Sequence, residues 1–305
     1  MISVLMLTYN REVLVGRAIE SVLNQSYTDF EYIIVNNGST DSSGTIADEY
    51  AEEDNRIRVI HRERGNIGSG RNVALEAARG DYMAFIDDDD WCEPDFLEFL
   101  YNLVVENNAD VSICGAADKA FDEKKIMTAE ESLIELMWRK RYNMAFPTKL
   151  FSRKLAAEIR FSVDDKYDDI SQMHRLLALA NRVAYHGLPK YTFYRHDNNN
   201  SAWTTDYNLL TSETLDEYLK TYRERTGWLS DLFPNSAAAW RYFEWSFMIS
   251  MVDKTTRFGI KGCERQLATI TQELSKNADE FLNGGFVLGF ERKWMRQYIL
   301  ERIGI

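Results

Sequence analysis

Four consecutive aspartates, at positions 87–90, are the residues of this sequence best suited to chemistry. They follow an apolar run at 83–86, which is predicted to be a buried strand, and they precede Trp91. A strand that ends in carboxylates delivers them to the C-terminal edge of a sheet, where open α/β sheets bind their ligands. Because adjacent like charges repel, the cluster needs a counter-ion, and Mg²⁺ or Mn²⁺ suits a ligand set made only of oxygens. A solvated acidic turn ahead of the next helix is the alternative.

Asp168 and Asp169 form a second acidic pair, which is followed by a segment of helical periodicity at 170–181. Carboxylates at the start of a helix are favoured by its dipole and its free N–H groups, so capping is one interpretation. The other is acid–base chemistry, in which one carboxylate takes a proton from a substrate. The two clusters can serve one reaction only if the fold brings them to the same cleft.

Alternating strand and helix signals indicate how the fold could do this. Strands are predicted at 2–7, 30–35, 57–60 and 82–86, and helices at 14–24, 44–52 and 72–79. This alternation indicates βαβ units and a mostly parallel sheet. The strand ends at Thr8, Asn36 and Asp87 are then expected to meet at one edge.

The stretch 61–70 is predicted to be a loop that contains Gly65, Gly68 and Gly70. Its spacing is neither the G-x-G-x-x-G of dinucleotide-binding folds nor the Gly-Lys-Ser/Thr ending of a P-loop. No glycine-rich turn follows the first strand either. These patterns argue against a nicotinamide-dependent dehydrogenase.

From about residue 204 the strand signals end and apolar residues recur at helical spacing. We therefore expect an α/β domain at 1–203 and a C-terminal helical region at 204–305. The last segment, 286–305, places Phe290 and Trp294 on an apolar side. It also carries basic residues, namely Arg292, Lys293, Arg296 and Arg302. Such a helix could lie on an anionic membrane surface, or its apolar side could pack on the rest of the protein or on a second copy in a homodimer.

The composition of the 305 residues is that of a globular protein, with 45% hydrophobic and 13% aromatic residues. The net charge of −12 argues against a nucleic-acid partner but leaves room for a small phosphate-bearing ligand. Three cysteines, Cys92, Cys114 and Cys263, fit no disulfide or zinc pattern, which favours a reducing, cytoplasmic location. No basic leader and no apolar run of ~18 residues is seen, so neither a signal peptide nor a spanning helix is expected.

Residues 2–203 resemble the family 2 glycosyltransferases, which have the GT-A fold of nucleotide-diphospho-sugar transferases and invert the anomeric centre. The resemblance rests on six motifs in the family's order and spacing. They are ISVLMLTYNR at 2–11, IIVNNGSTD at 33–41, NIGSGRN at 66–72, GDYMAFIDDDDW at 80–91, YDD at 167–169, and Tyr194-Arg195-His196 with Ser201. The expected fold is therefore a Rossmann-like, mostly parallel sheet with a C-terminal helical extension.

The resemblance implies roles for individual residues. Those that would hold the nucleotide sugar are Thr8, Tyr9, Asn10, Asn36, Asn37, Asn66, Gly68, Arg71, Asp87, Asp88 and Arg195. Within this set, Arg71 and Arg195 would face the diphosphate, and Asp87 or Asp88 the ribose. Asp89, with His196 as a second candidate, would hold Mn²⁺ or Mg²⁺. Asp169 would be the general base, with Asp168 as its acidic neighbour.

Trp91 is a candidate platform for the acceptor sugar, because an aromatic face stacks on a sugar ring; core packing is the alternative. The family usually has an aspartate in the turn that Asn36 and Asn37 occupy here. An aspartate only accepts hydrogen bonds, whereas an asparagine amide also donates them, so the identity of the base stays open.

The expected reaction is sugar transfer from a nucleoside-diphosphate sugar, with UDP favoured, to a glycan or lipid-linked glycan acceptor. The setting would be bacterial surface polysaccharide or glycolipid synthesis. One alternative is a nucleotidyltransferase that makes the nucleotide sugar, although such enzymes usually carry a Gly-rich, Lys/Arg-bearing loop where this chain has Thr8-Tyr9-Asn10. The other is a catalytically silent relative that binds sugar nucleotides.

Overall fold

The computed structural model describes residues 1–118, 120–163, 168–196, 199, 202–204 and 206–301. The chain divides into two compact units, Met1–Tyr194 and Arg195–Ile305, whereas the sequence placed the division after residue 203. Sequence expectations for three residues lie outside the described part of the chain: Tyr167, Ser201 and Arg302.

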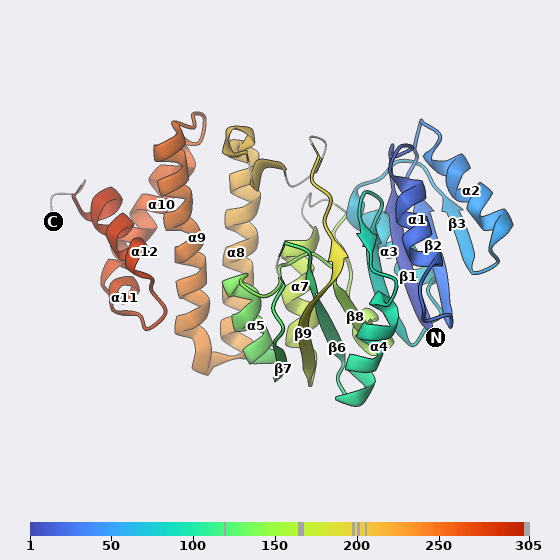
Figure 1. Cartoon of the computed structure of the whole chain (residues 1–305). Helices are drawn as coiled ribbons and strands as arrows, with labels where there is room; N and C mark the ends of the chain where they lie inside the picture. The colour runs from blue at the N-terminus through green and yellow to red at the C-terminus, as the bar shows by residue number, and fades with distance from the viewer. Residues whose placement is uncertain (119, 164–167, 197–198, 200–201, 205, 302–305) are drawn as a thin grey trace. The chain divides into compact units, whose positions relative to one another are not determined.

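The first unit is built on one mixed sheet, as the alternation of strand and helix signals predicted (Figure 1). Its parallel core consists of β1 (Ile2–Thr8), β2 (Phe30–Asn36), β3 (Ile57–His61) and β4 (Tyr82–Asp87). The helices that connect these strands are α1 (Val15–Leu23), α2 (Ser43–Glu53) and α3 (Ile67–Ala77). The sheet order is β3-β2-β1-β4-β8-β6-β9-β5, with β7 paired to β9.

The register of these strands brings their C-terminal ends together. Thr8 of β1 pairs with Asn36 of β2, and Leu7 pairs with Asp87 of β4. Apolar residues fill the strand interiors because both faces are covered, which is typical of parallel sheets. The expectation that Thr8, Asn36 and Asp87 share one edge is confirmed.

The second half of the first unit completes the sheet. Its elements are β5 (Trp91–Cys92), α4 (Phe96–Glu106), β6 (Val111–Ala116), β7 (Lys124–Met127), α5 (Ala129–Trp138), β8 (Lys149–Ser152), α6 (Arg153–Ala156), α7 (Asp168–Ala178) and β9 (Val183–Thr192). β8 runs antiparallel to β4 and β6, whereas β6 and β9 are parallel. The expected start of α7 at the acidic pair is confirmed by its first residue, Asp168.

The expectation of a loop through residue 70 is wrong, because α3 begins at Ile67. Asn66 caps this helix by accepting a hydrogen bond from the Ser69 N–H. Gly68 lies in the first turn because the backbone of Ser162 passes close by; a Cβ at Gly68 would stand 2.3 Å from the Ser162 carbonyl oxygen. Gly68 therefore serves close helix packing and not loop freedom.

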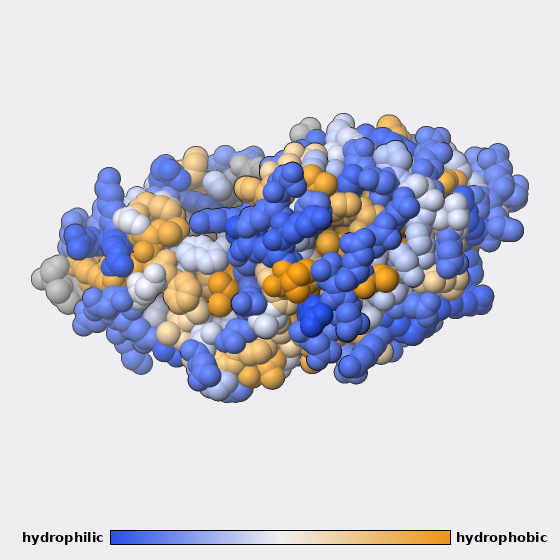
Figure 2. All heavy atoms as spheres, turned by 60° about the horizontal axis from the view of Figure 1, so that its bottom comes forward, coloured by the Kyte–Doolittle hydropathy of each residue, from blue (hydrophilic) through white to orange (hydrophobic). Residues whose placement is uncertain are grey.

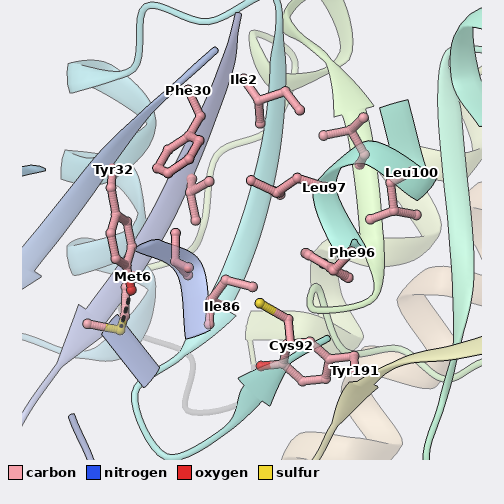
Figure 3. Close-up of a cluster of buried hydrophobic side chains, with 14 of the residues drawn as sticks. Ile2, Met6, Phe30, Tyr32, Ile86, Cys92, Phe96, Leu97, Leu100 and Tyr191 are labelled. Atoms are coloured by element: carbon pink, nitrogen blue, oxygen red, sulfur yellow. Dashed lines mark hydrogen bonds between the residues drawn. The ribbon is translucent and has the colours of Figure 1, made fainter. Parts of the chain in front are cut away.

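The core of the first unit lies between the sheet and its helices (Figure 3). Ile2, Phe30 and Tyr32 from the strands are buried there, together with Phe96 and Leu100 of α4. Each such side chain contributes roughly 1.5–3 kcal/mol on full burial. The Tyr32 hydroxyl contacts Met6 Sδ at 3.1 Å, so its polar end is also partnered.

The described residues of the second unit form helices and turns without strands, as expected. They comprise η1 (Ala202–Thr204), η2 (Tyr207–Leu209), α8 (Ser212–Leu232), η3 (Pro234–Ser236), α9 (Ala237–Phe258), α10 (Glu264–Lys276), α11 (Ala278–Asn283), α12 (Gly289–Trp294) and the π-helical η4 (Met295–Leu300). None of the described helices is long and apolar enough to cross a membrane. On the face in Figure 2, apolar side chains lie in several separate patches among hydrophilic ones.

The last two helices are docked on α9 by buried polar contacts. The Glu291 carboxylate accepts hydrogen bonds from the Tyr242 hydroxyl at 2.8 Å and the Ser246 hydroxyl at 2.5 Å. Met295 and Ile299 are fully buried, whereas Phe290 is 50% exposed. The inward side of this segment therefore packs within its own unit, and its remaining side faces outward.

Candidate active site

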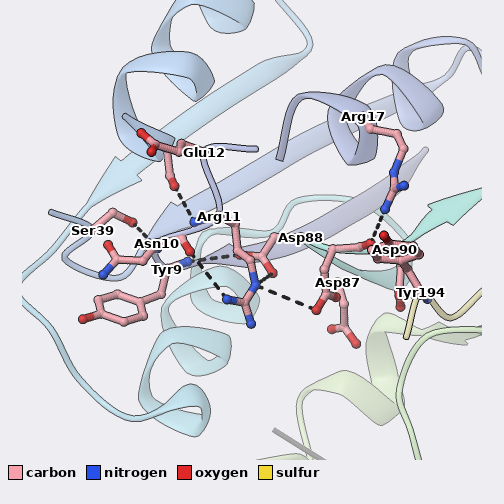
Figure 4. A network of polar contacts seen from close by, with 12 residues as sticks. Tyr9, Asn10, Arg11, Glu12, Arg17, Ser39, Asp87, Asp88, Asp90 and Tyr194 are labelled. Carbon is pink, nitrogen blue, oxygen red and sulfur yellow. Dashed lines mark hydrogen bonds and ion pairs between the residues drawn. The ribbon is translucent and has the colours of Figure 1, made fainter. Parts of the chain in front are cut away.

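The four aspartates after β4 have different partners. The Asp88 carboxylate accepts a hydrogen bond from the Tyr9 N–H at 3.1 Å and lies 3.7 Å from Arg11 Nε. Burial and the charge of Asp89 raise the pKa of Asp88 to about 7. Figure 4 shows Arg11 directed toward this run, with Tyr9 and Asn10 beside it. Arg11 was not predicted as a site residue, although it belongs to the first motif.

Asp90 stabilises the fold around the cluster. Its carboxylate accepts hydrogen bonds from the Tyr191 hydroxyl at 2.8 Å and from the Tyr194 N–H at 2.7 Å. The Asp87 N–H in turn donates to the Tyr191 oxygen at 3.1 Å. Burial, and then the charge of Asp89, raise the pKa of Asp90 to about 7. Both carboxylate oxygens of Asp90 are therefore engaged in joining the aspartate run to the end of β9.

Asp89 has two arginines nearby. Its Oδ2 atom lies 3.8 Å from Arg11 Nε, and its carbonyl accepts a hydrogen bond from Arg17 Nη2 at 2.6 Å. The Arg17 guanidinium lies over the rings of Trp91 and Tyr194, at 4.3 and 4.5 Å from their centroids. Trp91 is thus half-buried in a cation–π cluster, and its contact with an acceptor stays a prediction.

One guanidinium connects the two acidic clusters. Arg71 Nη1 donates to Asp168 Oδ2 at 2.9 Å and also to Asp169 Oδ1, while Nη2 lies 3.4 Å from Asp87 Oδ1. Burial raises the pKa of Asp168 to about 6 against the opposing effect of Arg71. The Asp168 side chain is 5% exposed and that of Asp169 is 32% exposed, so a substrate can reach Asp169 more readily.

The amides of the predicted base-binding turn are used to hold that turn together. Asn37 accepts a hydrogen bond from the Gly65 N–H at 3.2 Å and donates to the Gly65 carbonyl at 2.8 Å. Asn36 accepts from the Ser39 N–H at 3.0 Å, and its amide nitrogen contacts His61 Nδ1 at 3.0 Å. Each amide still has a lone pair or an N–H left for a base.

Five further predicted residues lie at the end of β1 and at the start of α3. Asn10 accepts a hydrogen bond from the Thr40 N–H at 2.8 Å, and Thr8 is fully buried. The Tyr9 ring is covered by the guanidinium of Arg64 at 3.6 Å from its centroid. Gly68 and the cap residue Asn66 position α3, as described above. Their contacts with a nucleotide sugar remain predictions.

Arg195 and His196 belong to the second unit. The His196 N–H donates to Asn199 Oδ1 at 2.7 Å. Their proposed places beside the diphosphate and the metal therefore stay predictions.

Among the described residues, no three His, Cys, Asp or Glu side chains converge on a ready-made metal site. Mg²⁺ in phosphate-transfer sites is commonly held by one or two carboxylates plus substrate phosphates and not by an all-protein cage. The all-oxygen cluster of Asp87, Asp88 and Asp89 at the sheet edge fits that donor set. A cation is thus compatible with these residues once a diphosphate supplies further ligands.

Comparison with known proteins identifies the family. The model of glycosyl transferase family 2 matches residues 3–167. The glycosyltransferase GlyG of Streptococcus pneumoniae is 31% identical over 229 residues, which cover 68% of this chain and 75% of GlyG. The chain spans less of other relatives, for example 32% of GlyA from the same organism.

Solved structures share the fold. TarS residues 1–349 from S. aureus, in complex with UDP-GlcNAc, superpose with a TM-score of 0.63 at 19% identity, covering 99% of this chain and 82% of that one. A mannosyltransferase of Pyrobaculum calidifontis, in complex with GDP-Man and Mn²⁺, gives a TM-score of 0.54 at 15% identity, covering 98% and 84%. The fold is thus that of the GT-A glycosyltransferases, as expected, and the chain belongs to glycosyl transferase family 2.

Proposed function

We propose that this protein is an inverting, metal-dependent glycosyltransferase that transfers a hexosyl or N-acetylhexosaminyl group from a UDP-sugar to an acceptor hydroxyl. The observation that carries the proposal is the meeting of the two acidic clusters on Arg71. Asp87 and Asp169 both contact that guanidinium, although they lie far apart in the sequence. One sugar-phosphate could therefore meet both clusters at once.

The chemistry divides between the clusters. A divalent cation, when bound, stabilises the negative charge of the departing diphosphate as a Lewis acid, and Asp89 is the residue proposed to hold it. Asp169 takes the proton of the attacking hydroxyl, a role that contributes about 10²–10⁴-fold. Inversion needs only this one base and no covalent bond between sugar and protein.

The ligands of related structures support a nucleotide-sugar donor, and the turn at Asn36 and Asn37 bears on which base that donor carries. TarS has been solved with UDP-GlcNAc and with UDP, and the mannosyltransferase with GDP-Man and Mn²⁺. An asparagine oxygen can accept the N3–H of uracil as an aspartate would. We therefore favour a UDP-sugar, with a glycan or lipid-linked glycan as acceptor in bacterial surface polysaccharide or glycolipid synthesis.

A donor panel tests this function. With Mn²⁺ present, the protein is expected to release nucleoside diphosphate from a UDP-sugar faster than from GDP- or dTDP-sugars, and chelator is expected to stop the release. Liquid chromatography of the nucleotide products measures both. Release of pyrophosphate from a nucleoside triphosphate and a sugar 1-phosphate would instead identify a nucleotidyltransferase. Binding without any release would identify a silent relative.

We also propose that the outward side of α12 and η4 meets the anionic inner face of the cytoplasmic membrane. Lys293 and Arg296 are exposed, and no described residue forms an ion pair with either. They line a hollow of 630 Å³ together with Arg292, Gln297, Gly289 and Glu301. Phe290 stacks edge-on against Trp294 at 4.7 Å beside these cations, which gives the aromatic and basic composition of an interfacial helix.

Charge reversal tests this surface. K293E/R296E is expected to weaken binding to vesicles that contain phosphatidylglycerol by more than about 30-fold, since each lost basic residue contributes about 1 kcal/mol near an anionic surface and the new carboxylates add repulsion. K261E/K276E changes the charge equally at two other exposed lysines of this unit and should bind normally. Co-sedimentation measures both. An equal loss of vesicle binding in the two variants would reject this surface as the membrane contact. If light scattering instead showed that the wild-type protein self-associates through this surface, its partner would be a second copy of the chain.

A further inference from the structure

The Arg71 side chain is buried, and three phenylalanine rings surround its guanidinium. Only 6% of the residue is exposed. Its guanidinium carbon lies 5.4, 5.5 and 5.6 Å from the ring centroids of Phe85, Phe146 and Phe161. Three aromatic rings around a guanidinium fix its plane and exclude water, so its hydrogen bonds have little freedom to change direction.

The Nη atoms of Arg71 donate to three carboxylates. Nη1 is shared by Asp168 and Asp169 at the start of α7, and Nη2 lies beside Asp87 at the end of β4. Charge-assisted bonds of this kind are the strongest hydrogen bonds in a protein. A diphosphate at these nitrogens would compete with carboxylates that are already bound.

We propose that Arg71 is a positioning residue, which orients the Asp169 carboxylate relative to the aspartates after β4, and that it does not bind the diphosphate of the donor. The proposal rests on the proposed glycosyltransferase function, in which Asp169 is the base. It replaces the role that the family resemblance suggested for Arg71. Arg11, whose Nε atom lies 3.7 and 3.8 Å from the carboxylates of Asp88 and Asp89, is left as a cation beside the proposed metal carboxylates.

Lysine cannot substitute in this role. Its ammonium is a single point charge, whereas the planar guanidinium directs separate N–H groups to Asp168, Asp169 and Asp87. A lysine at position 71 would keep the positive charge but could not hold all three carboxylates in fixed directions. A misplacement of about 1 Å in a catalytic group can cost on the order of 10²-fold in rate.

Separating turnover from donor binding tests the inference. R71K is expected to lower kcat about 10²-fold while leaving the Kd for UDP, measured by calorimetry, within about threefold of wild type. R71A is expected to regain part of its kcat when guanidinium ion is added, because the phenylalanine-lined space can accept it. A tenfold or larger rise in the Kd for UDP in R71K, whatever happens to turnover, would overturn the proposal.

Two controls complete the experiment. R56K disturbs the Arg56–Asp54 ion pair, which directly precedes the N-terminal end of β3. This variant should leave kcat unchanged. D168N removes one Arg71 partner and should lower kcat, with less than additive loss in R71K/D168N because the two residues act together. An additive double variant would contradict the shared role. If the wild-type protein released no nucleoside diphosphate from any donor, the proposed function itself would be rejected. The calorimetric Kd for UDP would still decide whether Arg71 binds the diphosphate.

Discussion

Asp169→Asn is expected to lower kcat by about 10²–10⁴-fold, while the Kd for the donor stays within about threefold. An amide has nearly the same shape as the carboxylate but cannot take a proton. The Asp169 side chain is 32% exposed and lies beside Arg71, so it is both reachable and oriented. Steady-state kinetics together with calorimetry of UDP binding measures the two effects separately.

Glu76→Gln is a suitable control for the base. Glu76 lies on α3 like Arg71, but its carboxylate pairs with Arg160 at the surface, where both side chains are more than half exposed. The same change of acid to amide should leave turnover unaltered there. If Asp169→Asn weakened donor binding instead of turnover, Asp169 would be a nucleotide ligand and the base would have to be sought elsewhere.

Asp89→Ala is expected to abolish Mn²⁺-dependent turnover, because it removes the carboxylate proposed to hold the cation against the donor phosphates. Activity measured against Mn²⁺ concentration should lose its metal dependence, and chelator should have no further effect. Full activity of the variant, or of wild type in chelator, would exclude the metal role.

Asp90→Asn is the matched comparison within the same run of aspartates. Asp90 accepts hydrogen bonds from Tyr191 and Tyr194, so the substitution disturbs a buried acceptor. We expect it to lower the free energy of unfolding by roughly 1–3 kcal/mol. Metal dependence should persist. The reverse outcome, with Asp90→Asn losing metal dependence and Asp89→Ala keeping it, would shift the proposed metal site by one residue.

The fold was largely predictable because the residues that form a strand, and those that end it, can be recognised from a short stretch of sequence. Apolar runs before Thr8, Asn36 and Asp87 are enough to place these residues at one edge of a parallel sheet. The pairing of Asp87 with Asp169 through Arg71 was not predictable, because it depends on how α3 and α7 pack. The family resemblance identified Asp87, Arg71 and Asp169 as site residues, but only the structure reveals that they are in contact.

Other features depend on tertiary packing alone. Two glycines of the predicted loop, Gly68 and Gly70, turned out to lie in α3, where the nearby backbone of Ser162 requires Gly68. Lys149 is fully buried on β8, although lysine is normally a surface residue. Its ammonium donates to the Ala145 carbonyl at 2.6 Å and burial lowers its pKa to about 7. No sequence pattern distinguished this lysine from exposed ones.

The close approach of Gly68 to Ser162 carries a constraint on how this protein can vary. Gly68 stands one helical turn before Arg71, and any β-carbon there would collide with the Ser162 carbonyl oxygen and push α3 away from its neighbour. Arg71 would then be carried away from the ring of Phe161 and from the acidic pair on α7. A residue that bears no functional group can therefore be as intolerant of replacement as the aspartates themselves, and an evolutionary or laboratory search for new donors must leave it in place.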